Sequence, residues 1–285
     1  MLRKKWIAGC ITIVVSLLLN WYAECIPLRL WAINDKSETT CFRLMSFNIK
    51  GTSKDFPDKA EKIAQVIKYY SPDIVFVSEI KGKNKLLLDS LLEEVLPVKS
   101  YSRNATTFFY SSHNLEEWKK LRDDENYPIG VYKCRAIIGK DTIQLYGCHL
   151  ASNNYTLSNR YVTPDSISNQ HDIKTYCSNI RHASIWRVKE AKAITSDINE
   201  SRFPLIIMGD MNDVGGSSCI NELKRVGLKD AWWEGGFGYG STIHTPLPYR
   251  IDHIMYSNGL RLLNIKVIDS MGLSDHDALY AGFEI

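Results

Sequence analysis

Short apolar runs bounded by turn-forming residues recur along this chain, and such runs predict buried β-strands. They cover residues 42–47, 74–77, 108–110, 131–138, 143–148, 205–208 and 254–256. Three other segments repeat their apolar residues with helical spacing and predict amphipathic helices over residues 58–70, 85–95 and 178–199. Ser71-Pro72-Asp73 should end the first helix, because the residue before a proline disfavours the helical conformation. The pattern therefore indicates an α/β protein.

The amino terminus has a different pattern. Arg3, Lys4 and Lys5 precede an apolar stretch over residues 6–19. Fourteen helical residues span roughly 21 Å, which is short of the ~30 Å hydrocarbon core of a bilayer. We favour an uncleaved signal anchor over residues 1–33, with a cleaved secretory signal peptide as the alternative. The basic residues would keep the amino terminus in the cytoplasm, so this reading predicts a single-pass membrane protein whose main domain is extracytoplasmic, or alternatively a secreted one.

Composition and charge limit the domain organisation and the kinds of binding site that the chain can have. A polar linker over residues 34–40 is followed by residues 41–285, which are enough for one large globular domain. The net charge is +3, and the first forty residues supply +2 of it, so a globally basic nucleic-acid-binding surface is not indicated. The seven cysteines contain no Cys-x-x-Cys pair, which argues against a zinc ribbon. Cys134 and Cys148 are expected in the core, whereas pairing among four others is left open: Cys25, Cys41, Cys177 and Cys219.

Polar side chains stand at the ends of several predicted strands. They are Asn48, Glu79, His149, Asp210 and Asp252. A charged side chain at the end of a buried strand is either exposed to water or part of a functional site. A set of this size is hard to explain by solubility alone. Asp210 and Asn212 are two residues apart, so on an extended segment both would project from the same face.

These residues belong to a longer ordered set of short motifs. In chain order the motifs are Ser46-Phe47-Asn48-Ile49, Ser78-Glu79, His149-Leu150, Gly209-Asp210-Met211-Asn212-Asp213, Gly240-Ser241-Thr242, Arg250-Ile251-Asp252-His253-Ile254 and Ser274-Asp275-His276. The set resembles the endonuclease/exonuclease/phosphatase superfamily of metal-dependent phosphohydrolases, which includes deoxyribonuclease I, apurinic/apyrimidinic endonucleases, sphingomyelinases and inositol-polyphosphate 5-phosphatases. The resemblance extends over residues 41–285, and with the amino-terminal segment it suggests a membrane-anchored, bacterial-type member.

The resemblance implies a fold and a metal site. The fold would be a four-layer α/β sandwich, in which two packed, mainly antiparallel sheets are flanked by helices. Glu79 and Asp275 would bind a divalent cation as carboxylate ligands, and Asn48 would hold the metal's water or the phosphate. Oxygen ligands of this kind suit Mg²⁺ or Mn²⁺. Ser78 replaces the glutamine that commonly precedes this glutamate, a change that could weaken support for the ligand without removing it.

The resemblance also implies catalytic roles. Asp210 would orient or deprotonate the attacking water, and Asn212 would hydrogen-bond the scissile phosphate. His276 would be paired with Asp252 and stabilise the transition state or transfer a proton. His149 would donate to the phosphate or the leaving oxygen. The adjacent His253 should face the opposite way and is expected to be structural.

The favoured function is that of a divalent-metal-dependent phosphodiesterase acting as an endonuclease. Its partners would be a phosphate-ester substrate, with nucleic acid preferred, and the membrane through the amino-terminal segment; no protein partner is predicted. A phospholipid or inositol-phosphate hydrolase on the same scaffold is the first alternative. An inactive membrane-tethered binding protein is the second. The aromatic, glycine-rich segment around Trp232, Trp233 and Tyr239 could contact a substrate or cover the core.

Overall fold

Two six-stranded β-sheets form the centre of the molecule in the computed structural model, which describes residues 2–23, 26–27, 41–100, 105–121, 130–153, 170–245 and 249–285. The first sheet has the order β11-β12-β1-β2-β4-β3. Its strands are β1 (Cys41–Asn48), β2 (Ile74–Ser78), β3 (Val98–Lys99), β4 (Phe108–Ser111), β11 (Arg261–Ile268) and β12 (Ala278–Glu284). The second sheet has the order β5-β6-β7-β8-β10-β9. Its strands are β5 (Asn114–Lys120), β6 (Gly130–Ile138), β7 (Asp141–His149), β8 (Leu205–Asp210), β9 (Lys229–Asp230) and β10 (Asp252–Tyr256).

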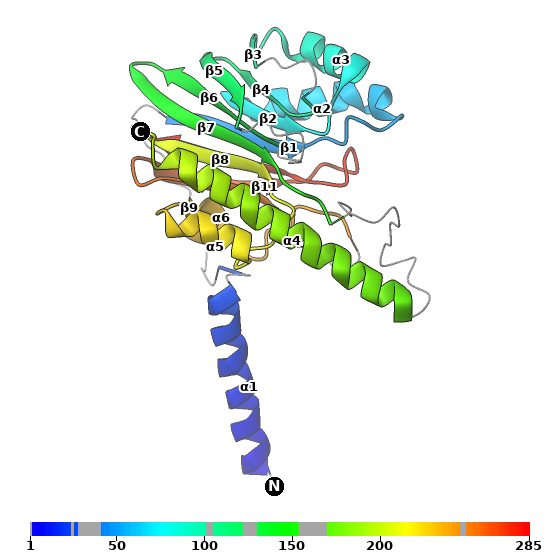
Figure 1. Ribbon diagram of the computed structural model, residues 1–285, viewed down its shortest axis with the longest axis vertical. Coiled ribbons are helices and arrows are strands. Elements are labelled where there is room, and N and C mark those ends of the chain that lie inside the picture. The colour runs from blue at the N-terminus through cyan, green and yellow to red at the C-terminus, as the bar shows by residue number, and fades with distance from the viewer. Residues whose placement is uncertain are drawn as a thin grey trace.

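Helices cover the outer faces of both sheets, and Figure 1 shows the resulting four layers. The helices α2 (Phe56–Tyr70) and α3 (Gly82–Leu92) pack on the first sheet, and α4 (Gln170–Ile198) and α5 (Ser218–Arg225) pack on the second. The short helix α6 (Ala231–Gly235) packs beside β10 and β11. The predicted α/β class and the four-layer sandwich implied by the resemblance are confirmed.

Side chains of β1 point alternately to the two faces of the sheet, and five consecutive residues from Leu44 to Asn48 are buried. Phe42 and Leu44 point into the core between the sheets, whereas Met45 and Phe47 point into the core under α2. Successive side chains of a strand face opposite sides of the sheet, so a strand covered on both faces is apolar throughout. This is why the strand appears in the sequence as a continuous apolar run.

The helices also follow from local chemistry. The apolar face of α2 is buried, and the helix ends at Ser71, whose left-handed backbone (φ 46°) lets its N–H reach the carbonyl of Ile67. Pro72 then prevents continuation. The third predicted helix was expected over residues 178–199, but α4 already begins at Gln170. Its first turns carry too few apolar residues to be recognised by periodicity.

The strand pairing decides where the polar strand ends lie. Strands β1 and β2 are parallel and place Asn48 opposite Ser78, while β7 and β8 are parallel and place His149 opposite Asp210. Strand β10 is antiparallel to β8 and starts with Asp252 opposite Asp210. The polar strand ends therefore meet at one edge of the sandwich.

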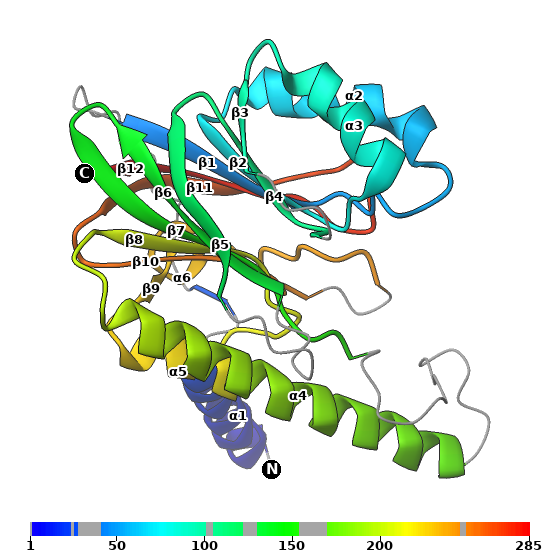
Figure 2. The same cartoon turned by 45° about the horizontal axis from the view of Figure 1, so that its top comes forward.

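The structure corrects the prediction for the amino terminus. Helix α1 (Leu2–Ala23) extends away from the sandwich in Figures 1 and 2. Within the described part of the chain, no helix has both the length and the apolar character needed to cross a bilayer. The Asn20 side chain turns back onto the backbone of Ile26, to which it donates at 2.8 Å and from which it accepts at 3.0 Å. The predicted membrane anchor, and the localisation inferred from it, are wrong; the predicted linker over residues 34–40 lies outside the described residues.

The cysteines whose placement is described form no disulfide with one another. Cys134, Cys148 and Cys219 are buried, and Cys41 and Cys177 are exposed. Cys134 and Cys148 thus lie in the core as expected. Among these described residues no disulfide links the candidates for pairing, and Cys25 lies outside the described part of the chain.

Candidate active site

The amide of Asn48 lies at the centre of the polar edge. Its Nδ2 atom donates to Glu79 Oε1 at 3.0 Å and to Asp210 Oδ2 at 3.1 Å, so one amide joins residues from both sheets. His149 Nε2 lies 3.6 Å from Glu79 Oε1 and 3.8 Å from Asp210 Oδ2. The structure thus brings together four of the residues that the sequence singled out.

Several of these side chains depend on unusual backbone conformations. Glu79 and Asn212 have left-handed backbones (φ 62° and 51°), and so does Lys50 (φ 47°). A non-glycine residue in this region costs of order 1 kcal/mol or more and persists where the surroundings fix it. At the polar edge this conformation turns the chain sharply at the end of a strand, so that the side chain faces the site.

His276 and Asp252 form a buried pair. His276 Nδ1 lies 2.8 Å from Asp252 Oδ2, and both residues are almost fully enclosed. Thr242 Oγ1 accepts the backbone N–H groups of Ile251 and Asp252 and so fixes the start of β10. Burial by itself would lower the pKa of His276, but the Asp252 carboxylate outweighs it and raises this pKa to about 10. The imidazole is therefore positively charged over the neutral pH range.

Asp210 lies between the two halves of the site. Its Oδ1 accepts the Asn212 N–H at 2.8 Å, and its Oδ2 lies 3.7 Å from Nε2 of His276. Burial and the nearby charge of Asp252 raise the pKa of Asp210 above its usual range, against the opposing effect of the two histidines. A carboxylate with a raised pKa is a better proton acceptor than an ordinary aspartate.

Asn212 and Asp275 lie at the sides of this cluster. The Asn212 amide donates one N–H to the Leu150 carbonyl at 3.0 Å, and its NH2 group has a second N–H to donate. Asp275 is half-exposed and pairs with Lys50, whose Nζ lies 2.7 Å from Asp275 Oδ2. Burial acts to raise the pKa of Asp275, but the hydrogen bond from Lys50 holds this pKa below the usual range. Asp275 therefore pairs with a lysine of the same chain, a contact that the sequence analysis did not predict.

A buried network on α4 supports the segment after His149. Arg187 donates to the Ala151 carbonyl at 2.9 Å, and Glu190 Oε2 accepts the Ala151 N–H at 2.9 Å. Arg187 also binds Asp213 at 3.0 Å. Burial raises the pKa of Glu190 to about 8. The sequence analysis did not identify Arg187 or Glu190. What the sequence shows of them is a charged pair three positions apart on a helix face that is otherwise apolar.

A second buried network explains His253. Its ring lies 2.7 Å from Arg250 and 3.1 Å from Asp230, and it is fully buried. Burial opposes ionisation of Asp230, but Arg250 and His253 hold the pKa of this carboxyl well below its usual range. His253 thus packs on the side of β10 away from Asp252, as predicted for a structural histidine.

The aromatic segment covers the core instead of opening a binding surface at Trp232. This ring is buried, and its Nε1 donates to the Gly238 carbonyl at 3.1 Å. A Cβ atom on Gly240 would lie 2.2 Å from the ring, and the backbone of Gly240 is left-handed (φ 64°). The glycines are therefore required for close packing. Tyr239 is 39% exposed.

The donor set fits a hard divalent cation. Atoms of Glu79, His149 and Asp210 all lie within 4.8 Å of one another, and the two carboxylates converge on a single amide. Like charges this close are stabilised by a cation, and carboxylate oxygens are ligands that Mg²⁺ and Mn²⁺ prefer. The Asn48 amide turns its NH2 group toward these carboxylates, and its oxygen accepts the Lys50 backbone N–H. Of the three predicted ligands, Asn48 and Glu79 lie together, whereas Asp275 lies against Lys50.

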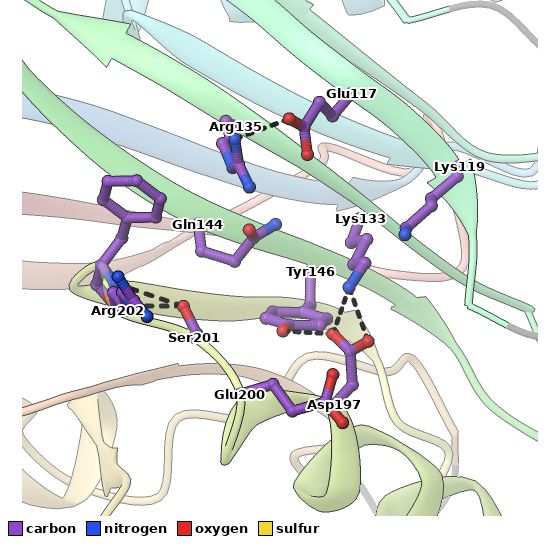
Figure 3. A pocket seen from close by; sticks show the side chains of 11 residues that line it. Glu117, Lys119, Lys133, Arg135, Gln144, Tyr146, Asp197, Glu200, Ser201 and Arg202 are labelled. Atoms are coloured by element: carbon purple, nitrogen blue, oxygen red, sulfur yellow. Dashed lines mark hydrogen bonds and ion pairs between the residues drawn. The ribbon is translucent and has the colours of Figure 1, made fainter.

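A separate polar pocket of about 290 Å³ lies on the second sheet beside the end of α4. Figure 3 shows Lys133 and Tyr146 directed at Asp197, and Arg135 paired with Glu117. None of the predicted site residues lines this pocket. Its charges largely neutralise one another, so it does not compete with the polar edge as the candidate active site.

Comparisons with known proteins agree with this architecture. A model of the Endonuclease/Exonuclease/phosphatase family matches residues 45–276. No curated protein sequence matches the chain. A humanized TDP2 from D. rerio is 16% identical, with 87% of this chain and 100% of that chain covered at a TM-score of 0.62.

Two further structures have the same fold. D. rerio TDP2 complexed with a single-strand DNA product is 16% identical, with 86% of this chain and 100% of that chain covered and a TM-score of 0.61. An endonuclease/exonuclease/phosphatase family protein from Leptotrichia buccalis is 14% identical, with 86% and 100% covered and a TM-score of 0.63. Identities this low indicate the fold alone, but the family model covers most of the chain. This chain therefore belongs to the Endonuclease/Exonuclease/phosphatase family.

Proposed function

We propose that this protein is a divalent-metal-dependent phosphodiesterase that cleaves nucleic acid. The observation that carries the proposal is the position of Asp210, a buried carboxylate with a raised pKa that lies between Asn48, His149 and the charged His276. A proton acceptor beside a buried imidazolium suits the attack of water on an anionic phosphate. Two buried carboxylates close together, Asp210 and Asp252, repel each other and destabilise the fold, which a purely structural cluster would not require.

Each side chain of the cluster has a role in the proposed reaction. Asp210 orients the attacking water and accepts its proton. His276, kept protonated by Asp252, stabilises the negative charge that develops on the phosphoryl oxygens. Asn212 and His149 donate hydrogen bonds to the phosphate or the leaving oxygen. Asn48 and Glu79 would hold Mg²⁺ or Mn²⁺, with Asp275 as a further ligand, and the bound ion would supply Lewis-acid stabilisation of the phosphate.

Nucleic acid is the substrate class that the comparisons favour. The D. rerio TDP2 structure with the same fold contains a single-strand DNA product. The residues after the first forty carry a net charge of only +1, so we expect local contacts to phosphate instead of a broad basic surface.

The test measures cleavage of supercoiled plasmid and of a single-stranded oligonucleotide by the full chain. Activity should require Mg²⁺ or Mn²⁺, disappear with chelator, and be lost in Asp210→Ala. Asp58→Ala is the matched control, because Asp58 is exposed on α2 and outside the cluster. A protein that binds metal but cleaves neither DNA substrate would contradict the nuclease proposal, and phospholipid and inositol-phosphate substrates would then be tested.

A further inference from the structure

The ammonium of Lys50 lies against the acidic side of the active site. Its Nζ is 2.7 Å from Asp275 Oδ2, and Glu79 attracts the same charge electrostatically. The backbone of Lys50 is fixed as well, because its N–H donates to Asn48 Oδ1 at 3.2 Å and its φ is 47°. Lys50 is thus directed at the site by its own backbone.

This arrangement places a positive charge among the residues that are expected to hold a metal ion. Asn48 contacts the Lys50 backbone, Asp275 contacts the Lys50 ammonium, and Glu79 lies within its electrostatic reach. A divalent cation and an ammonium group repel each other and would neutralise the same carboxylates. The carboxylate of Asp275 cannot be fully available to both.

We propose that Lys50 is a resident cation of the active site that competes with the divalent ion for Asp275. In the protein without metal, the ammonium neutralises Asp275. Binding of the ion weakens this contact and releases the flexible lysine side chain, which then donates to an oxygen of the substrate phosphate. This inference rests on the proposed function, since it assumes that the acidic cluster binds a divalent ion.

The half-exposed state of the pair makes the exchange feasible. The side chains of Lys50 and Asp275 are 49% and 42% exposed, so the ammonium can leave the carboxylate without losing hydration. Exposed ion pairs are weak, with a typical strength of ~1 kcal/mol or less, which a divalent ion can overcome. Lysine is also a strong hydrogen-bond donor to phosphate, because its ammonium carries three rotatable N–H groups.

The first experiment measures Mn²⁺ binding by electron paramagnetic resonance in the full chain without substrate. Lys50→Met should bind Mn²⁺ about fivefold more tightly than the wild type, because the competing charge is gone. Lys50→Arg keeps the charge and should bind Mn²⁺ nearly as the wild type does. Lys59→Met is the control, since Lys59 forms an exposed ion pair of the same 2.7 Å length with Asp55.

The second measurement uses inorganic phosphate as the probe, by calorimetry in the Mn²⁺-saturated protein. Phosphate should bind Lys50→Met about tenfold more weakly than Lys50→Arg, because only the latter retains a cation that can contact phosphate. The proposal would be overturned if Lys50→Met bound Mn²⁺ no more tightly than the wild type. It would also be overturned if Lys59→Met bound Mn²⁺ more tightly to the same extent, or if both Lys50 variants bound phosphate equally. If the wild type itself bound no Mn²⁺, the proposed metal-dependent function would fail first.

Discussion

The pair formed by Asp252 and His276 shows how one contact sets the charge of a site. With a pKa of about 10, His276 stays protonated at neutral pH, and a proposed role as imidazolium predicts that kcat/KM falls only near that pH. Asp252→Asn removes the charge that raises this pKa, so the alkaline limb should move down toward the usual value of about 6.5. Rates measured from pH 6 to 11 for both proteins would show the shift, and coincident alkaline limbs would exclude His276 as the titrating group.

The same pair links stability to pH. Because the pKa of His276 is raised in the folded state, its stabilising contribution is complete below about pH 6.5 and is lost as the pH rises toward about 10. The free energy of unfolding should therefore decrease over this interval, and less so in Asp252→Asn. Urea denaturation at pH 6 and pH 10 measures the difference.

The buried Asp210 carboxylate lowers the stability of the fold. Burial and the charge of Asp252 raise its pKa, so its ionised form is held at the expense of stability. Asp210→Asn should lower kcat by a factor of about 10² to 10⁴ and leave the free energy of unfolding equal or higher. Single-turnover rates and urea denaturation of the same preparation test both parts, and retained turnover would remove Asp210 from the proposed mechanism.

Glu79 is the residue on which the proposed metal requirement depends most directly. Glu79→Gln keeps the size of the side chain but removes one ligand charge, so half-saturation by Mg²⁺ should rise about tenfold. The activity of both proteins is titrated with Mg²⁺ at fixed substrate. An unchanged titration curve would show that another group is the principal ligand.

At the level of elements, the site depends on how closely β7 and β8 approach each other. A Cβ atom on Gly209 would lie 1.9 Å from the Cys148 carbonyl oxygen, and the Gly209 backbone has a φ of 139°. Gly209→Ala should therefore separate Asp210 from His149 and destabilise the fold by about 3 kcal/mol or more. Gly139→Ala is the control, because it has a positive φ of 61° but open space around it. Equal loss of stability in the two variants would contradict the close-approach argument.

The elements also show where sequence patterns are sufficient. Strands β1, β2 and β8, which are buried on both faces, were predicted because continuous apolar runs indicate buried strands. The edge strand β5 was missed, since its sequence NLEEWKK is largely polar. Strands β11 and β12 were missed as well, although β12 is apolar and buried. Strands β3 and β9 have two residues each, which is too short for any periodicity.

At the level of the whole molecule, the sandwich should fold without the amino-terminal helix. The described apolar side chains of α1, including Ile11, Ile13 and Leu18, are largely exposed, and none of the α1 side chains that the structure describes belongs to the three cores. The fragment 41–285 should therefore have the same free energy of unfolding as the full chain, within about 1 kcal/mol. Urea denaturation of both proteins measures this. A clearly less stable fragment would show that residues 1–40 contribute to the fold.

The sequence by itself determined the α/β class, most of the strands and the residues that gather at one edge. It did so because buried strands are apolar, and the polar groups at their ends are then conspicuous. Only the tertiary structure decided which of these groups touch, since the distances from Asn48 to Asp210 and from Asp252 to His276 depend on strand register and sheet packing. It also revealed Lys50 beside Asp275, residues separated by most of the chain. Contacts of this kind leave no local pattern, because the energy that holds them comes from the packing of both sheets.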